Sequence, residues 1–108
     1  MLTLPFAAFA CAGEQPVQKE TDSKAAVRAA EEVGAEGLPR SALYLDLAKQ
    51  QIARAEKLMK DGEQKQAELT LDRARADAEL AIALAKADDE RVVAEETAKR
   101  LEQMQKGI

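Results

Sequence analysis

Two stretches of this sequence carry apolar residues at alternating spacings of three and four, and Gly62 and Glu63 lie between them. The first series is Leu45, Ala48, Ile52, Ala55 and Met59. The second series is Ala67, Leu71, Ala74, Ala78, Ala81 and Ala85. Such spacing places each series along one face of an α-helix, as in helices that pack against a partner helix. Because a short turn makes neighbouring helices antiparallel, the two series predict an all-α fold built on an αα-hairpin, with these residues as its seam.

Small side chains make up most of this seam. Alanine at most positions of the second series lets the two helix axes approach to roughly 8 Å. The chain has 108 residues and no Trp, and Tyr44 is the single aromatic residue after residue 13. A short chain with such side chains buries a thin core, so we expect a narrow helical structure to which a partner would add stability.

A shorter helix is predicted before the hairpin. Asp22 or Ser23 offers an N-cap, an Ala-rich stretch follows, and Gly34 and Gly37 end the helix. Before it, residues 12–22 are polar and contain turn-forming residues, so we expect a flexible tether there. The folded unit is therefore predicted to span residues 23–106.

The two helices of the hairpin are predicted to differ in length. The first begins at Ser41, or slightly earlier at Pro39, and ends before Gly62. The second runs from about Glu63 to about Lys106, but the seam fails past Ala85, where Asp88 and Glu95 occupy its next positions with Val92 between them. We therefore expect residues 88–106 to project beyond the hairpin and to meet a protein partner or a second copy.

Residues 1–13 are apolar and uncharged, unlike the rest of the chain. Ala8 and Ala10 stand at the third and first positions before Cys11, which is the only cysteine. This pattern, a small residue, any residue, a small residue and then Cys, resembles the bacterial lipobox. In a lipobox the signal peptide is cleaved before the cysteine, here after Ala10, and the new N-terminal cysteine, here Cys11, receives acyl chains. Attachment through several acyl chains holds a protein stably on a bilayer. Residues 1–11 are thus predicted to be a signal peptide with its lipobox.

Two features depart from that signal pattern, and three other roles for Cys11 stay open. No Lys or Arg precedes the apolar run, and the run is short and contains Pro5, which we attribute to a start codon assigned too late or to a missing beginning. The alternatives are a buried structural thiol, a reactive thiol, and part of an uncleaved signal.

The composition argues against several classes of function. Acidic and basic residues are interspersed with a net charge of −4, which does not form the basic patch that nucleic acids require. The chain has no His, the most common general base and metal ligand. Asp88, Asp89 and Glu90 diverge around a helix, so we expect a solvated face and no metal site. We expect no cofactor, no small-molecule substrate and no catalytic residues.

The remaining polar and aromatic residues favour ordinary structural roles. Arg73 and Arg75 are expected to pair within their helix with Asp77 and Glu79, although they could bind an anion. Tyr44 is expected to pack at the open end of the hairpin, with an interface role as the alternative. The glutamines are expected at the helix surface; they are Gln50, Gln51, Gln64 and Gln66.

The sequence AAVRAAEEVGAE, followed by ALYLDLAKQQIARAEKLMKDGEQKQAELTLDRARADAELAIALAK, resembles a domain-of-unknown-function family of short helical bacterial lipoproteins and envelope proteins. In that family an Ala-rich helix precedes a TPR-like hairpin with this Gly-Glu turn, and the resemblance covers residues 24–87. It implies a Gram-negative envelope location, at the periplasmic face of the outer membrane, and Ala12 after Cys11 is similar to outer-membrane sorting. Some relatives carry an OmpA-like domain that grips peptidoglycan; residues 1–108 contain none, so peptidoglycan binding is not carried over.

These observations lead to two alternative hypotheses about function. The first is a lipid-anchored periplasmic helical protein with a structural, scaffolding or protein-interaction role and no enzymatic activity. The second is a soluble oligomeric coiled-coil adaptor without a lipid anchor, in which residues 1–13 are a truncated signal or a helix in the core.

Overall fold

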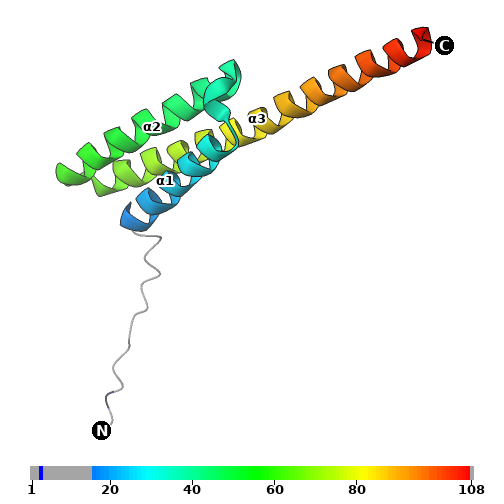
Figure 1. The fold of residues 1–108 in the computed structure, drawn as a ribbon. Coiled ribbons are helices and arrows are strands. Elements are labelled where there is room, and N and C mark those ends of the chain that lie inside the picture. Colours follow the sequence, from blue (N-terminus) through cyan, green and yellow to red (C-terminus); the bar gives the residue numbers. More distant parts are fainter. Residues whose placement is uncertain (1–2, 4–15, 108) are drawn as a thin grey trace.

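The computed structural model describes Thr3 and residues 16–107, and these residues form three α-helices and one short 3-10 turn. The elements are α1 (Pro16–Glu32), η1 (Ala35–Gly37), α2 (Pro39–Lys60) and α3 (Gln64–Lys106). Figure 1 shows α1 and α2 lying along the first half of α3, while the second half of α3 continues alone. The described part of the chain contains no β-strand, which confirms the all-α prediction.

A tight turn joins α2 to α3 and makes them antiparallel. Gly62 has a φ of 79°, a left-handed conformation that glycine adopts without a steric penalty. The backbone N–H of Glu63 donates to the carbonyl of Leu58 at 2.9 Å, and the N–H of Gly62 donates to that of Met59 at 3.2 Å. These bonds satisfy carbonyls that the end of a helix leaves free. The predicted hairpin is therefore present.

The start of α2 shows which of two predicted caps is used. α2 begins at Pro39, whose fixed φ and missing N–H suit the first position of a helix. Ser41 is not the N-cap: it lies inside the helix, fully buried, and its hydroxyl has no hydrogen-bond partner among the described residues. The apolar pattern that begins at this residue includes it on the buried face.

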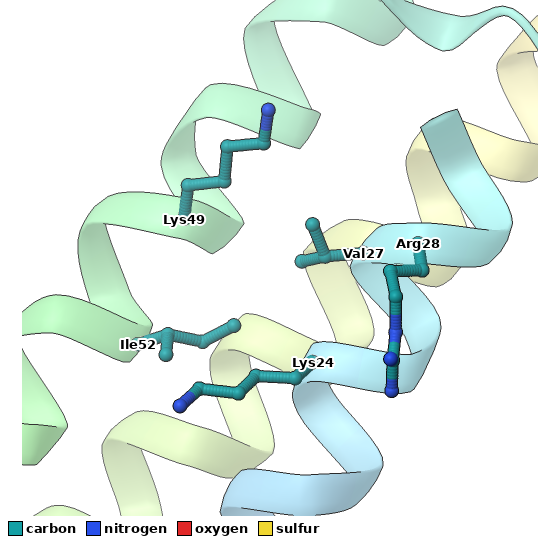
Figure 2. A pocket seen from close by; sticks show the side chains of 5 residues that line it. All are labelled: Lys24, Val27, Arg28, Lys49 and Ile52. Carbon is teal, nitrogen blue, oxygen red and sulfur yellow. The ribbon is translucent and has the colours of Figure 1, made fainter. Parts of the chain in front are cut away.

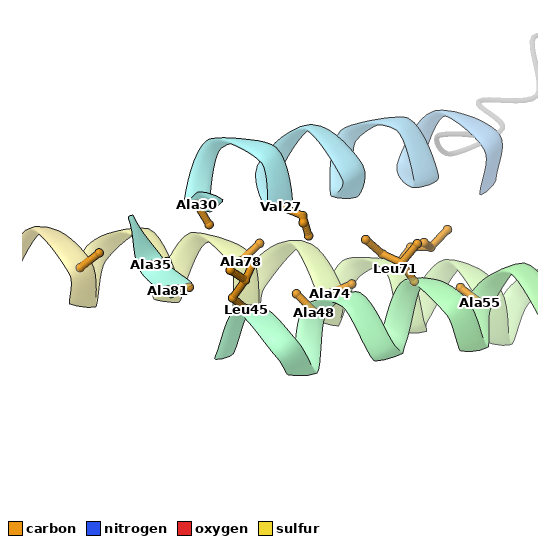
Figure 3. Packing of buried hydrophobic residues seen from close by; sticks show 12 residues of the cluster. Val27, Ala30, Ala35, Leu45, Ala48, Ala55, Leu71, Ala74, Ala78 and Ala81 are labelled. Carbon is orange, nitrogen blue, oxygen red and sulfur yellow. The ribbon is translucent and has the colours of Figure 1, made fainter. Parts of the chain in front are cut away.

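Between α2 and α3 the core consists of the predicted seam. Every seam residue is buried except Met59, which is half-buried. Figure 3 shows the small side chains of Ala74, Ala78 and Ala81 between the helices, with Leu45 and Leu71 as the larger members. These two leucines are almost fully buried, at 2% and 0% exposure. The contact is therefore narrow, and it depends on alanines that permit a close approach of the two axes.

The start of α1 contradicts the sequence prediction. Residues 16–22 are helical and do not form a tether; the predicted residues 12–15 lie outside the described part of the chain. Pro16 opens the helix, and Lys19 holds this first turn to α3 through an ion pair with Asp72 at 2.9 Å. The prediction was wrong because it judged these polar residues by composition alone, whereas a contact with a distant helix stabilises them.

Ser23 explains how α1 approaches α3. It is not an N-cap but a mid-helix residue with 1% exposure. Its hydroxyl oxygen lies 2.7 Å from the carbonyl oxygen of Lys19 and 2.9 Å from that of Leu71, and its single hydrogen can serve either acceptor. Val27 and Ala30 continue the same buried face, so α1 covers a second side of α3.

Candidate interaction surfaces

The C-terminal half of α3 projects from the rest of the fold, and we call residues 89–107 the arm. Every residue of the arm is exposed, although the helix continues without a break to Lys106. Val93 is 61% exposed, Leu101 55% and Met104 62%. At 3.6 residues per turn these three side chains share one side of the helix, so the arm presents a discontinuous apolar strip to solvent.

Asp88 marks the border between the packed part of α3 and the arm. The sequence predicted a solvated face beginning at this residue, but Asp88 is buried, with 7% exposure. Its carboxylate accepts a hydrogen bond from the guanidinium of Arg40 at 2.7 Å. Asp88 therefore occupies the next seam position and forms an ion pair with the first turn of α2. The projection begins one residue later than predicted.

Other polar residues that the sequence singled out are partly reassigned. Arg75 pairs within its helix with Glu79 at 3.1 Å, as predicted. Asp77 instead accepts a hydrogen bond from Gln51 across the hairpin at 3.0 Å, so Gln51 is not an ordinary surface residue. Tyr44 packs partly buried against the core. Within residues 16–107, no group of three or more acidic residues or cysteines has the geometry to hold a metal ion.

A groove between α1 and α2 has a volume of about 380 Å³. Figure 2 shows its lining: Val27 and Ile52 form an apolar floor, and three cationic side chains stand around it. The cations are Lys24, Arg28 and Lys49. The sequence analysis missed this groove because it did not predict how α1 lies against α2.

The charges around this groove do not favour an anionic ligand. Lys24 lies 2.8 Å from Glu20 and 3.2 Å from Glu56, and these hydrogen bonds raise its pKa above 10.5. Lys49 lies 2.9 Å from Glu31, which likewise raises its pKa, with a smaller contribution from Glu36. Since carboxylates already neutralise both lysines, they act as clasps between α1, η1 and α2, not as vacant anion-binding groups.

A comparison with protein families identifies the family to which this chain belongs. Residues 19–97 match the model of a family described as a domain of unknown function (DUF4398), so the chain belongs to this family. The match begins in the first turns of α1, contains the whole hairpin and ends within the arm. The predicted membership of a domain-of-unknown-function family is confirmed. No curated protein and no solved structure matches the chain. Among the described helices, none has the length and apolar character to cross a bilayer.

Proposed function

We propose that this protein is a lipid-anchored helical protein of the Gram-negative envelope, facing the periplasm from the outer membrane, which presents the arm to a protein partner. The observation that carries this proposal is the unbroken continuation of α3 beyond Asp88, where no residue of the arm packs against the described chain. Because nucleating a helix is unfavourable, an arm that continues a packed helix is better ordered than a free segment of the same sequence. The packing of α3 against α1 and α2 therefore sets the direction in which the arm projects.

The anchor in this proposal depends on the lipobox-like sequence that ends at Cys11, which lies outside the described residues. Because α1 begins at Pro16, only residues 12–15 separate Cys11 from the folded unit. A fully extended connection of that length spans at most about 18 Å. A lipid on Cys11 would therefore hold the three-helix unit close to the membrane surface, closer than the tether of residues 12–22 would.

The test of the anchor is the intact mass of the protein isolated from the envelope of its host, expressed from its own gene with the upstream sequence. We expect a mature chain that starts at Cys11 and carries a diacylglyceryl and a fatty acyl group. The Cys11→Ser variant should lack the lipid and leave the membrane fraction. An unmodified mass with both versions in the soluble fraction would contradict the anchor and favour the soluble oligomeric adaptor.

The test of the arm is photo-crosslinking in the host from a single reactive residue. We place it at Leu101 in the arm and, as the matched control, at Leu43, which is equally exposed at 57% but lies on α2. We expect adducts of defined mass from position 101 and none from position 43. Equal labelling at both positions, or none at either, would contradict a role for the arm in binding a partner.

A further inference from the structure

A second apolar stripe runs along the exposed side of α3, opposite its buried seam, and we call it the back stripe. Near its start, Leu69 lines a shallow hollow together with Arg54 and Leu58 of α2. It consists of Leu69, Ala76, Leu80, Ala83, Ala87 and Ala94, all exposed. At 3.6 residues per turn its mean direction lies roughly 170° around the helix from the buried seam. Leu69 is 56% exposed and Leu80 39%, in the part of α3 that lies within the bundle.

The surroundings of α3 leave this one side free. On one side α1 reaches Leu71 and Asp72, through Ser23 and Lys19. On another side α2 reaches Asp77 through Gln51. Helical geometry places the back stripe about 100° around α3 from the α1 side and about 90° from the α2 side. A fourth helix can therefore pack against the back stripe without displacing α1 or α2.

The back stripe continues a spacing of three and four through two charged residues, Arg73 and Glu90. Both are exposed, and neither forms an ion pair or a side-chain hydrogen bond within residues 16–107. Some other charged residues of α3 are paired within the chain, among them Asp72, Arg75 and Asp88. The two unpaired charges of the stripe have opposite signs, so each could neutralise the other in a partner that carries the same stripe.

We propose that two copies of this chain pack antiparallel through their back stripes, with Arg73 of each copy paired with Glu90 of the other. In an antiparallel pair of helices, the two kinds of heptad core position face each other, and Arg73 and Glu90 are of opposite kinds. The dimer axis then passes between residues 81 and 82. A two-fold axis repeats each contact, so one pairing gives two interchain ion pairs.

The same register matches every other position of the back stripe. Leu80 faces Ala83 of the second copy, and Ala87 faces Ala76. Ala94 faces Leu69, so large residues meet small ones, as close helix packing requires. Beside the stripe, Glu79 faces Lys86 of the second copy. A shift of one heptad in one direction places Glu90 against Leu80, and a shift in the other places Arg73 against Ala83. Charge complementarity therefore selects one register.

This dimer goes beyond the proposed function, since it needs neither the lipid on Cys11 nor the apolar strip of the arm. The contact spans residues 69–94, and most of the arm extends past the end of the partner's back stripe. The proposals for the anchor and the arm can be contradicted while the dimer is confirmed. The dimer can likewise be contradicted while those two proposals are confirmed.

The first test measures self-association by sedimentation velocity over a range of concentrations, with the full chain carrying Cys11→Ser so that no lipid contributes. We expect a concentration-dependent dimer. Arg73→Glu alone and Glu90→Arg alone should each raise the dissociation constant about tenfold or more. The double variant Arg73→Glu/Glu90→Arg should restore most of the affinity. Circular dichroism checks that each variant remains helical, which we expect because both residues are exposed.

Three outcomes of this experiment would contradict the proposed dimer or its ion pairs. A monomer at every concentration overturns the proposal. A dimer that both single charge reversals leave unchanged shows association through another surface, for example the arm, and also overturns it. Weakened single variants without recovery in the double variant overturn the pairing of Arg73 with Glu90.

The second test fixes the register by disulfide trapping in the same Cys11→Ser background. A chain carrying Ala76→Cys is mixed with a chain carrying Ala87→Cys, and both are oxidised. These positions face each other in the proposed register, so we expect a covalent heterodimer. The matched control replaces the second chain with one carrying Ala94→Cys, which faces residue 76 only in a register shifted by one heptad. Preferential trapping of the control pair would overturn the register.

Discussion

The two halves of α3 belong to one unbroken helix, but one half is packed against other helices and the other is exposed to solvent. Residues 64–88 lie against α1 and α2, and their seam side is buried, whereas residues 89–107 are exposed throughout. Both halves carry charges of both signs, but residues 64–88 contain eight alanines and residues 89–107 contain two. The difference lies at the seam positions: Ala78 and Ala85 occupy them in the first half, and Glu95 and Lys99 occupy them in the second. Apolar residues in register thus distinguish the packed half from the arm, although both halves are helical.

Truncating a large side chain should show the largest difference in stability effect between the two halves of α3. Leu71 is fully buried, so Leu71→Ala should lower the free energy of unfolding by about 2–5 kcal/mol. Leu101 is 55% exposed, so Leu101→Ala should change it by less than about 0.5 kcal/mol. Urea denaturation followed by circular dichroism measures both. Similar losses for the two variants would show that the arm is packed in solution.

Enlarging an alanine tests the same contrast from the opposite direction. Ala78 has 0% exposure between the helices, so Ala78→Leu should force them apart and cost about 1–3 kcal/mol. Ala98 is exposed in the arm, and Ala98→Leu should have an effect of less than about 0.5 kcal/mol. The same denaturation experiment compares them. If Ala78→Leu left the free energy of unfolding unchanged, this would contradict a close approach of α2 and α3 at residue 78.

The ion pair at the border should contribute less than the apolar core. Arg40→Ala removes the partner of the buried Asp88, and we expect a loss of about 0.5–1.5 kcal/mol, reduced because Arg40 is itself exposed. Lys106→Ala breaks an exposed pair with Glu102 in the arm and should cost at most a few tenths of a kcal/mol. Hydrogen exchange near Asp88 should accelerate in the first variant only. Identical exchange in both variants would contradict the role of Asp88 as the end of the packed part.

The smallest effect should come from the lysine clasps at high pH. The pKa values of Lys24 and Lys49 are raised by carboxylates in the fold, so the stabilisation is complete below pH 10.5 and is lost as pH rises through the raised values. We expect the urea midpoint of Lys49→Met to fall less between pH 10 and 12 than that of the parent chain. Lys99→Met, in the arm, should follow the parent. If the urea midpoint of Lys49→Met falls with pH as steeply as that of the parent chain, the ion pairs of Lys49 do not stabilise the fold.

The sequence predicted the hairpin well because its signals are local and repeated. The spacing from Leu45 to Ala85 and the turn at Gly62 determine two helices and the faces that meet. Asp88 was misjudged because a carboxylate at a seam position is stabilised by Arg40, which is far away in the sequence. Such a pairing depends on the register of α2 against α3, and composition does not reveal it.

The position of α1 was the main gap in the sequence-based picture. Residues 16–22 are polar, and the signals that fix them are Lys19 to Asp72 and Ser23 to Leu71, both between distant parts of the chain. The groove beside Val27 and Ile52 follows from the same packing and was missed for the same reason. Ser41 was assigned as a cap from its residue type, although Pro39 was already a sufficient start for the helix. The proposed roles of Cys11 and of the arm stay predictions.

The unbroken backbone of α3 from Gln64 to Lys106 also has a mechanical meaning. The helix acts as a lever whose first part is clamped by two other helices and whose second, shorter part is free. The free part is roughly 27 Å long at 1.5 Å per residue, so tilting the clamped end by about 10° would move the tip by about 5 Å. A load applied near Met104 would therefore be transmitted to the Arg40–Asp88 contact, which serves as the fulcrum.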